Sequence, residues 1–327
     1  MHIAIMGAGA VGGYFGGLLS RAGHAVTFIA RGAHLAAMRQ RGLVLDTPNG
    51  RLVVDSARCV EQPSEVGRCD VVLFAVKAYD IEAAAAPLAP LVAGGACVVS
   101  VLNGVDHQDR IASVLGAGSV LGGLAMVSGV IVEPGLIRYT SNMSNLRFGE
   151  ADGSMSPRAL AFRDACTGAG FSADVDTDIR AAQWTKFVGL ATNAALTSLF
   201  RLPVGYIYHD PDIIPMATQA FAEVAAVARA EGIALPDDIV ARALALHQSF
   251  PRTMYASMFH DLAKGRPLEL DSFSGHIVRR GRALGVATPV HEMAWLALKP
   301  YLHGAPAPLQ SPTQPPLQTP LSGTGPH

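Results

Sequence analysis

The chain has 327 residues, of which 50% are hydrophobic and 16% are charged, so it is long enough for two domains with sizeable cores. Its 25 basic and 26 acidic residues leave a net charge of −1, which gives no electrostatic basis for binding nucleic acid or an anionic membrane. The four cysteines form no C-x-x-C pair, so the sequence predicts no disulfide framework and no metal site, and we expect a cytoplasmic protein.

The N-terminal stretch predicts a strand, a tight turn, a helix and a second strand. His2–Met6 is a short apolar run, residues 13–21 have helical character, and residues 25–30 are a second apolar run. The turn carries the pattern G-x-G-x-x-G, whose glycines allow the sharp turn, the approach of a pyrophosphate and the packing of helix on strand. The expected dinucleotide-binding residues are Gly7, Ala8, Gly9, Ala10, Val11 and Gly12.

The end of the second strand bears on which dinucleotide binds. An NAD site usually has Asp or Glu there, which accepts a hydrogen bond from the ribose 2′-hydroxyl, but this chain has Arg31. A guanidinium offers a fork of donors to a 2′-phosphate and no acceptor to a hydroxyl. We therefore expect NADP(H) as the cofactor, the alternative being that Arg31 is a solvated surface charge.

Two further polar residues follow predicted strands. The pattern predicts a helix over residues 33–41, a hairpin of residues 43–46 and 51–54, strands over residues 70–76 and 96–102, and a helix over residues 79–91. Lys77 and Asn103 follow the two strands, and ligands of open α/β sheets bind outside the carboxyl ends of the strands. We therefore expect both residues at the cofactor site. A solvated lysine and an Asn-Gly turn are the alternatives.

The remaining pattern divides the chain. Strands are predicted within residues 120–132, 135–138 and 148–149, and helices over residues 157–168, 178–200, 211–232, 237–250, 267–281 and 289–301. Alternating strands and helices followed by helices alone predict an α/β fold: a Rossmann-type, doubly wound N-terminal domain of residues 1–176 and an all-helical C-terminal domain of residues 177–302. Residues 303–327 are rich in proline and lack Asp, Glu, Lys and Arg, so we predict a disordered tail.

Three residues of the predicted helical domain could take part in chemistry. Lys186 lies on an otherwise apolar helix, where a lysine either extends to solvent or faces a cleft. Ser257 precedes a short apolar stretch, and Glu269 lies in the predicted first turn of a helix, where the helix dipole favours a carboxylate. The pattern alone leaves a structural or a functional role open for each of them.

Together these residues resemble those of the ketopantoate reductases (2-dehydropantoate 2-reductases) over nearly the whole chain, excluding the tail. The matching motifs are Gly7-x-Gly9-x-x-Gly12, Arg31, Val76-Lys77-Ala78, Asn103-Gly104, Trp184-x-Lys186 with Leu196-Thr197, Ser257-Met258, Leu268-Glu269-Leu270-Asp271, Gly275 and Arg279-Arg280. Many enzymes share the glycine motif, whereas the spacing of the lysine and the glutamate is much more specific.

The resemblance implies NADPH-dependent reduction of 2-dehydropantoate (ketopantoate) to pantoate, a step of pantothenate and coenzyme A biosynthesis. Hydride then passes to C2, Lys186 is the general acid, and Glu269 helps to hold the substrate and that lysine. Asn103 and Ser257 contact polar groups of the substrate, and Lys77 lies near the cofactor. A homodimer is compatible with the family but does not follow from the sequence.

The chain departs from the family pattern beside the expected general acid. Many members carry asparagines four and eight residues after that lysine, and this chain has Leu190 and Ala194 there. Asn193 either recovers one substrate contact or only packs. The substrate pocket is therefore expected to be more apolar than in the family, which leaves open ketopantoate or a more apolar 2-oxo acid. A catalytically silent NADP(H)-binding protein is a further alternative, which the presence of Lys186 and Glu269 disfavours.

Overall fold

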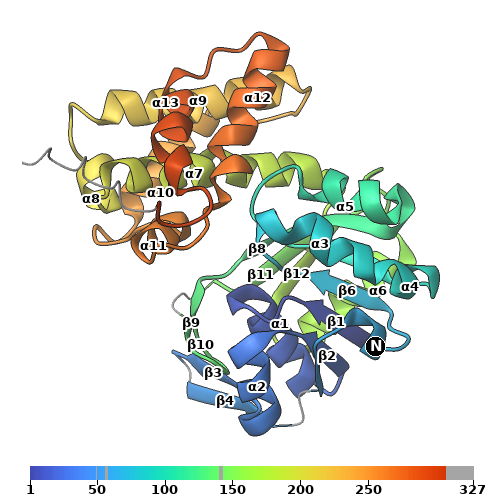
Figure 1. The fold of residues 1–327 in the computed structure, drawn as a ribbon. Coiled ribbons are helices and arrows are strands. Elements are labelled where there is room, and N and C mark those ends of the chain that lie inside the picture. Colours follow the sequence, from blue (N-terminus) through green and yellow to red (C-terminus); the bar gives the residue numbers. More distant parts are fainter. Residues whose placement is uncertain (49, 56–57, 140–142, 307–327) are drawn as a thin grey trace, which may run out of the picture.

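The computed structural model describes residues 1–48, 50–55, 58–139 and 143–306, and over these residues it has an α/β part followed by a helical part (Figure 1). The long helix α7 (Ile179–Phe200) begins beside the sheet and runs into the helical part. The predicted fold class, a doubly wound sheet domain followed by helices, is confirmed.

The main sheet of the described residues has eight strands in the order β12-β11-β8-β7-β6-β1-β2-β5, and all neighbouring pairs are parallel except β8 and β11. Its strands are β1 (His2–Met6), β2 (Ala25–Ile29), β5 (Arg58–Val60), β6 (Val71–Phe74), β7 (Cys97–Ser100), β8 (Val120–Met126), β11 (Asn145–Gly149) and β12 (Ser172–Val175). Because β1, β2, β6 and β7 are parallel, the residues that follow them lie along one edge of the sheet.

Four other strands of the described chain form a second sheet in the order β4-β3-β10-β9. These strands are β3 (Leu43–Thr47), β4 (Gly50–Val54), β9 (Gly129–Glu133) and β10 (Leu136–Tyr139). The predicted hairpin at β3 and β4 is confirmed as an antiparallel pair. The apolar run over residues 120–132 is divided between the two sheets, because the chain leaves the main sheet after Met126.

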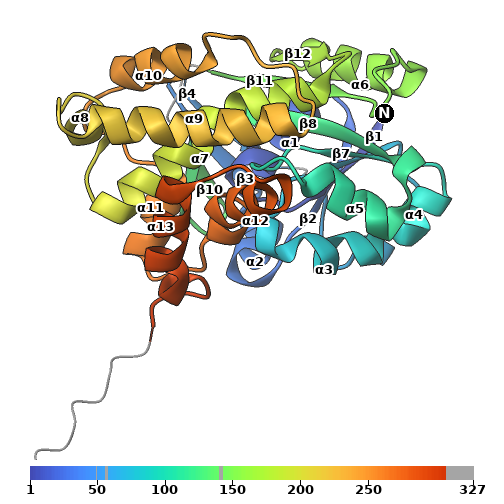
Figure 2. The same cartoon turned by 90° about the horizontal axis from the view of Figure 1, so that it is seen from above.

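Helices cover both faces of the main sheet (Figure 2). They are α1 (Ala10–Arg21), α2 (Gly32–Arg41), α3 (Ile81–Ala85), α4 (Ala89–Ala93), α5 (His107–Leu115) and α6 (Pro157–Gly168), with short 3-10 turns η1 (Pro63–Glu65), η2 (Ala78–Asp80), η3 (Ala86–Leu88) and η4 (Ala117–Ser119). The helix predicted over residues 79–91 is broken into η2, α3, η3 and α4. Pro87 and Pro90 supply no backbone N–H, which explains the interruption.

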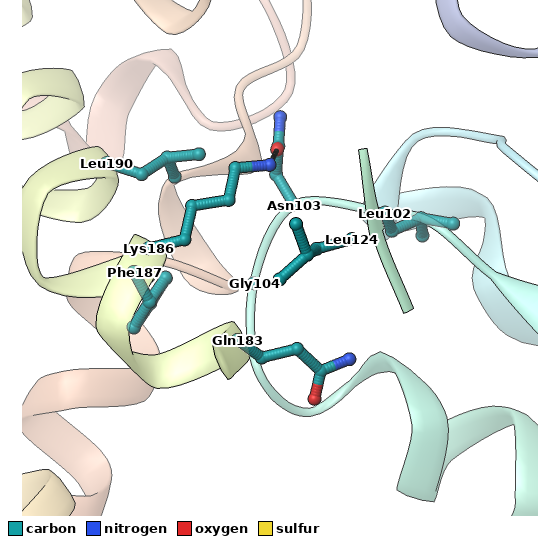
Figure 3. Close-up of a pocket in the computed structure, with 8 residues that line it drawn as sticks. All are labelled: Leu102, Asn103, Gly104, Leu124, Gln183, Lys186, Phe187 and Leu190. Atoms are coloured by element: carbon teal, nitrogen blue, oxygen red, sulfur yellow. Dashed lines mark hydrogen bonds between the residues drawn. The ribbon is translucent and has the colours of Figure 1, made fainter. Parts of the chain in front are cut away.

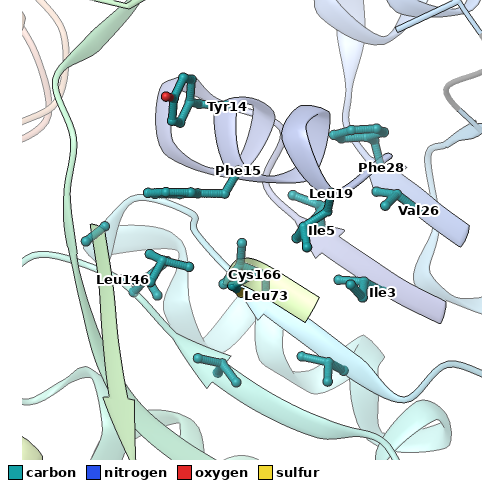
Figure 4. Close-up of a cluster of buried hydrophobic side chains, with 14 of the residues drawn as sticks. Ile3, Ile5, Tyr14, Phe15, Leu19, Val26, Phe28, Leu73, Leu146 and Cys166 are labelled. Atoms are coloured by element: carbon teal, nitrogen blue, oxygen red, sulfur yellow. The ribbon is translucent and has the colours of Figure 1, made fainter. Parts of the chain in front are cut away.

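The packing of α1 on the sheet fixes the position of the glycine turn (Figure 4). Phe15 of α1, Ile5 of β1 and Phe28 of β2 are fully buried in one apolar cluster. A Cβ at Gly16 would lie 2.6 Å from the ring of Phe28, so the helix approaches the sheet closely because this residue lacks a side chain. Each large apolar side chain buried here contributes ~1.5–3 kcal/mol.

In the helical part, α9, α10, α12 and α13 pack against α7 or its neighbours. The elements after α7 are α8 (Val204–Ile207), α9 (Ile214–Ala230), α10 (Ile239–Ser249), α11 (Ser257–Ala263), η5 (Glu269–Asp271), α12 (Ser274–Leu284), α13 (Pro289–Leu298) and η6 (Lys299–Tyr301). The predicted cap of α7 is confirmed, because a carboxylate oxygen of Asp178 accepts the N–H of Ala181 at 3.0 Å.

The prediction of a helix over residues 267–281 is wrong at the N-terminal end of that range. Residues 269–271 form the 3-10 turn η5, and α12 begins only at Ser274. The backbone of Phe273 is non-helical (φ −104°, ψ −99°), and this residue separates the two elements. Glu269 therefore lies in a short turn rather than in the first turn of a long helix.

At the C-terminal end of the described chain, the N–H of Ala305 donates to the carbonyl of Gly265 at 3.2 Å. The rest of the predicted tail, residues 307–327, lies outside the described residues. Among the helices that the structure describes, none has both the length and the apolar character needed to cross a membrane.

Candidate functional site

The turn after β1 is shaped for close approach. Gly7 has φ +95°, and a Cβ there would lie 2.9 Å from the carbonyl oxygen of Ala75. A Cβ at Gly12 would lie 2.2 Å from the carbonyl oxygen of Gly7. A Cβ at Gly9, by contrast, would have no atom within 4 Å. Gly9 therefore faces open space at the N-terminus of α1, where a pyrophosphate can approach the backbone, and the turn fits a dinucleotide.

His34, which sequence reasoning missed, holds this turn from the side of α2. The N–H of Gly135 donates to Nδ1 of His34 at 3.0 Å, so Nδ1 is unprotonated. The proton is then on Nε2, which donates to the carbonyl of Ala8 at 2.9 Å. Burial lowers the pKa of His34 below its usual value, although the bond to Ala8 opposes this. The neutral imidazole thus joins the glycine turn to the β9–β10 connection.

Arg31 lies two residues after the end of β2, at the mouth of the same site. Its Nη2 donates to a carboxylate oxygen of Asp80 at 2.8 Å, and its side chain is 82% exposed. Asp80 belongs to η2, which follows β6. The guanidinium therefore pairs with a residue that follows β6, across the end of β1, which lies between β2 and β6 in the sheet.

Lys77 joins the two parts of the chain. Its Nζ donates at 2.9 Å to Asp261 of α11 and at 2.9 Å to Glu269 of η5. The other oxygen of Glu269 accepts the N–H of Ala78 at 3.2 Å, and this glutamate side chain is 4% exposed. Burial disfavours the charge of Lys77, but Glu269 and Asp261 outweigh it and raise the pKa of Lys77 above its usual value.

Lys186 reaches from α7 to the sheet domain (Figure 3). Its Nζ donates to Oδ1 of Asn103 at 3.0 Å and to the carbonyl of Ala125 at 2.8 Å. With Oδ1 occupied by the ammonium, the amide nitrogen of Asn103 is the group left to donate to a ligand. Burial lowers the pKa of Lys186 to about 8, although the nearby charge of Glu269 acts in the opposite direction. An amine with such a pKa can release a proton near neutral pH.

A narrow cavity at this amine is largely apolar (Figure 3). Its lining residues are Leu102, Asn103, Gly104, Leu124, Gln183, Lys186, Phe187 and Leu190. Leu190 therefore lies where the family pattern has an asparagine, beside the amine. Ala194 is buried in the core of the helical part. Asn193 is also buried, and its Oδ1 accepts from the hydroxyl of Tyr208 at 3.3 Å, which favours the packing role for Asn193.

The predicted site residues thus form two adjoining groups. Lys186 and Asn103 meet at the cavity, whereas the oxygens of Glu269 accept from Lys77 and Ala78. Ser257 is exposed at the start of α11, one turn before Asp261 on the same helix. Sequence reasoning missed Asp261, although its spacing of four residues from Ser257 is a helical one.

The glycine turn and the cavity at Lys186 and Asn103 agree with comparisons with known proteins. Residues 3–153 match the family model described as ketopantoate reductase PanE/ApbA, and residues 178–301 match the model of its C-terminal domain. The chain belongs to the ketopantoate reductase family. Members of this family are oxidoreductases that act on a CH–OH group, and this family member is an enzyme of that type.

Relatives of this family member differ in their substrates. An uncharacterised oxidoreductase of Bacillus subtilis (strain 168) is 28% identical, over 92% of this chain and 99% of its own. A ketopantoate reductase structure from Ralstonia eutropha JMP134 is 33% identical, with a TM-score of 0.85 over 92% of this chain and 98% of that one. A ternary complex of D-mandelate dehydrogenase with NADH and anilino(oxo)acetate is 25% identical, with a TM-score of 0.83 over 92% of this chain and 98% of that one.

These relationships establish the general chemistry. This ketopantoate reductase family member uses a nicotinamide dinucleotide, NAD(P), and acts on a small-molecule oxo acid. Its glycine turn fits such a cofactor by the geometry described above.

Proposed function

We propose that the chain uses NADPH to reduce a 2-oxo acid with an apolar substituent next to the carbonyl, with Lys186 as the general acid. The observation that carries this proposal is the environment of the Lys186 amine. It hydrogen-bonds Asn103 and shares a cavity with Phe187 and Leu190. A proton donor in an apolar pocket suits the reduction of a carbonyl that bears an apolar group.

Arg31 supports NADPH over NADH. It occupies the position after β2 where a carboxylate would select the unphosphorylated ribose, and its side chain is largely exposed at the mouth of the site. Asp80 lies beside it, so a 2′-phosphate would meet net repulsion without the guanidinium. The mandelate dehydrogenase relative binds NADH, and kinetics with both cofactors distinguish the two choices for this chain.

Bound NADPH would supply the hydride that adds to C2 of the oxo acid. Addition of hydride places negative charge on the carbonyl oxygen. The ammonium of Lys186 stabilises this charge and then transfers a proton to the oxygen, which gives the hydroxy acid. Asn103 accepts from Lys186 through Oδ1 and so aims the amine, while its amide N–H groups are available to a substrate oxygen.

Glu269 and Lys77 support this arrangement from the domain interface. Glu269 ties the end of β6 to η5 through Lys77 and Ala78. Its carboxylate also favours the charged form of Lys186. We propose that Glu269 keeps the two parts of the chain closed around the substrate, and that Ser257, exposed on α11, contacts the substrate from the helical side.

The substrate follows from the residues around the amine. Ketopantoate carries a hydroxyl on its branched chain, whereas Leu190 places an apolar group beside the amine, where the family pattern has an amide. An apolar pocket distinguishes a substrate from its hydroxylated analogue by only ~10²-fold, whereas a pocket built to bind the hydroxyl rejects the analogue lacking it by ~10⁴-fold or more. Ketopantoate itself, the substrate for which the family is named, is the second candidate.

Ketopantoate and trimethylpyruvate form a matched pair for this test, because they differ by one hydroxyl. We expect kcat/KM with NADPH to be equal for the two or higher for trimethylpyruvate. A preference for ketopantoate of ~10⁴-fold would assign the chain to pantoate synthesis instead. Oxidation of NADPH by neither acid, nor by an aromatic 2-oxo acid, despite tight NADPH binding, would support a silent binding protein.

A substitution at Leu190 tests the pocket directly. Leu190→Asn restores an amide beside the amine and should shift the ratio of kcat/KM values toward ketopantoate by about five- to tenfold, the effect of one hydrogen bond. Leu190→Met keeps the site apolar and serves as the control. If both variants change the ratio equally, Leu190 does not set the substrate preference.

A further inference from the structure

Gln183 and Lys186 lie about one turn apart on α7 (Figure 3), and both donate hydrogen bonds to carbonyls of strand β8. The side-chain nitrogen of Gln183 donates to the carbonyl of Gly123 at 3.0 Å, and Lys186 donates to that of Ala125 at 2.8 Å. These two carbonyls lie on β8 beyond Leu121, the last residue that pairs with β7. Carbonyls two residues apart on a strand point the same way, so the two side chains form parallel links between helix and strand.

Gln183 is itself held by a buried imidazole. Its side-chain nitrogen also lies 3.3 Å from Nε2 of His107, so this ring nitrogen must be the acceptor. The ring proton is then on Nδ1, which donates to the hydroxyl of Ser100 at 2.7 Å. Gln183, His107 and Ser100 are all buried. Burial, with smaller contributions from the charges of Lys186 and Arg110, lowers the pKa of His107 to about 3.

The hydrogen bonds of this network therefore allow one protonation state of His107, the neutral ring with its proton on Nδ1. A charged imidazole would present N–H to the N–H of Gln183 and would repel the nearby ammonium of Lys186. The neutral ring fixes the Gln183 amide, and the amide fixes the turn of α7 that ends in Lys186. Gln183 also lines the cavity but makes no transfer of proton or hydride.

We propose that Gln183, held by His107 and Ser100, is a positioning residue that sets the Lys186 amine against Asn103. This inference rests on the proposed role of Lys186 as general acid. Neither the glycine motif nor the family resemblance assigns a role to Gln183 or His107. A displacement of about 1 Å at a catalytic group can cost ~10²-fold in rate. Loss of the Gln183 contact should therefore lower the rate by a measurable amount.

Gln183→Met keeps the length of the side chain and removes both donors. We expect kcat to fall by about 10- to 100-fold while the KM for NADPH stays within about twofold. Gln108→Met is the matched control, because Gln108 is also buried and also donates to a carbonyl of β8, that of Val120 at 3.4 Å, but lies on α5. Its kcat should stay near normal.

A double variant separates positioning from a general loss of structure. In a Lys186→Ala background, Gln183→Met should lower kcat by less than about twofold further, because the group that it positions is gone. The proposal is overturned if Gln183→Met lowers kcat by the same factor in the wild-type protein and in the Lys186→Ala variant. A normal kcat for Gln183→Met alone also overturns it. If Lys186→Ala itself has normal kcat, the proposed general acid fails instead.

A milder change guards against misfolding of the Gln183 variant. Ser100→Ala leaves Nδ1 of His107 without its acceptor and frees the ring to change tautomer, so kcat should fall by about three- to tenfold. Thermal unfolding and NADPH fluorescence titration of both variants report folding and cofactor binding. A normal kcat for a folded Ser100→Ala variant would show that the imidazole does not hold Gln183.

Discussion

Lys77 and Glu269 meet across the two parts of the chain, with Nζ of the lysine 2.9 Å from one oxygen of the glutamate. The other oxygen accepts the N–H of Ala78 at 3.2 Å. This pair joins the end of β6 to η5, and Lys186 joins α7 to Asn103 beside it. The contacts that close the domains and the contacts that place the proton donor are therefore separate but adjacent.

The first prediction concerns this pair. Glu269→Gln should raise the KM for the 2-oxo acid and lower the melting temperature, since it removes a buried charge and leaves an amide N–H facing Lys77. The lysine side chain is 39% exposed and keeps Asp261, so the loss in stability should be only ~1 kcal/mol. Asp261→Asn is the control, because Asp261 also pairs with Lys77 but does not bind Ala78. Equal effects of the two variants would contradict a special role for Glu269.

The pH dependence of the reaction should report Lys186. Burial lowers the pKa of this amine to about 8, and the active form of a general acid is the protonated one. kcat/KM for the 2-oxo acid at saturating NADPH should therefore be highest below pH 8 and fall as the pH rises through that value. Glu269→Gln should move this fall to lower pH, because the carboxylate favours the charged amine. A profile that is flat up to pH 10 would contradict the assignment.

Cofactor preference should depend on Arg31. Arg31→Ala should raise the KM for NADPH by about tenfold or more and leave that for NADH nearly unchanged, since a charge-assisted contact with phosphate is worth ~1.5–3 kcal/mol. Asp80→Asn removes the neighbouring carboxylate and should favour NADPH slightly. If Arg31→Asp retains the preference for NADPH, the 2′-phosphate is recognised elsewhere.

His34 should affect cofactor binding without affecting the chemical step. His34→Ala removes the donor to Ala8 and the acceptor for Gly135, so the glycine turn loses its link to α2 and to the β9–β10 connection. We expect the Kd for NADPH to rise by about fivefold or more, with kcat at saturating NADPH unchanged. Equilibrium fluorescence titration measures the Kd. A lower kcat with normal NADPH affinity would mean that His34 acts elsewhere.

The sequence predicts the sheet domain well because its signals are local. Buried parallel strands are continuous apolar runs, and the glycine turn follows one of them. The short elements β5, β12 and α11 are not predicted, since each has too few residues to show a period. The helix predicted to start near Pro267 begins only at Ser274, because the backbone turns at Phe273 so that Glu269 meets the other part of the chain.

In the candidate site too, the contacts between distant parts of the chain could not be predicted from local sequence signals. Lys186 and Asn103 are both predicted from the sequence, but their contact depends on how two parts of the chain pack. The resemblance associates Glu269 with the general acid, whereas its hydrogen bonds go to Lys77 and Ala78. Gln183 lies three positions before Lys186, so the two side chains share a helix face, and this helical spacing is a signal for Gln183 that the sequence contains.

The most direct measurement of the central claim is kcat for Lys186→Ala with NADPH and trimethylpyruvate, together with the Kd for NADPH. Loss of a positioned general acid predicts a fall in kcat of ~10²–10⁴-fold, while NADPH binding stays normal because the glycine turn and Arg31 are unchanged. A variant that turns over near the normal rate would contradict the assignment of Lys186 as the proton donor.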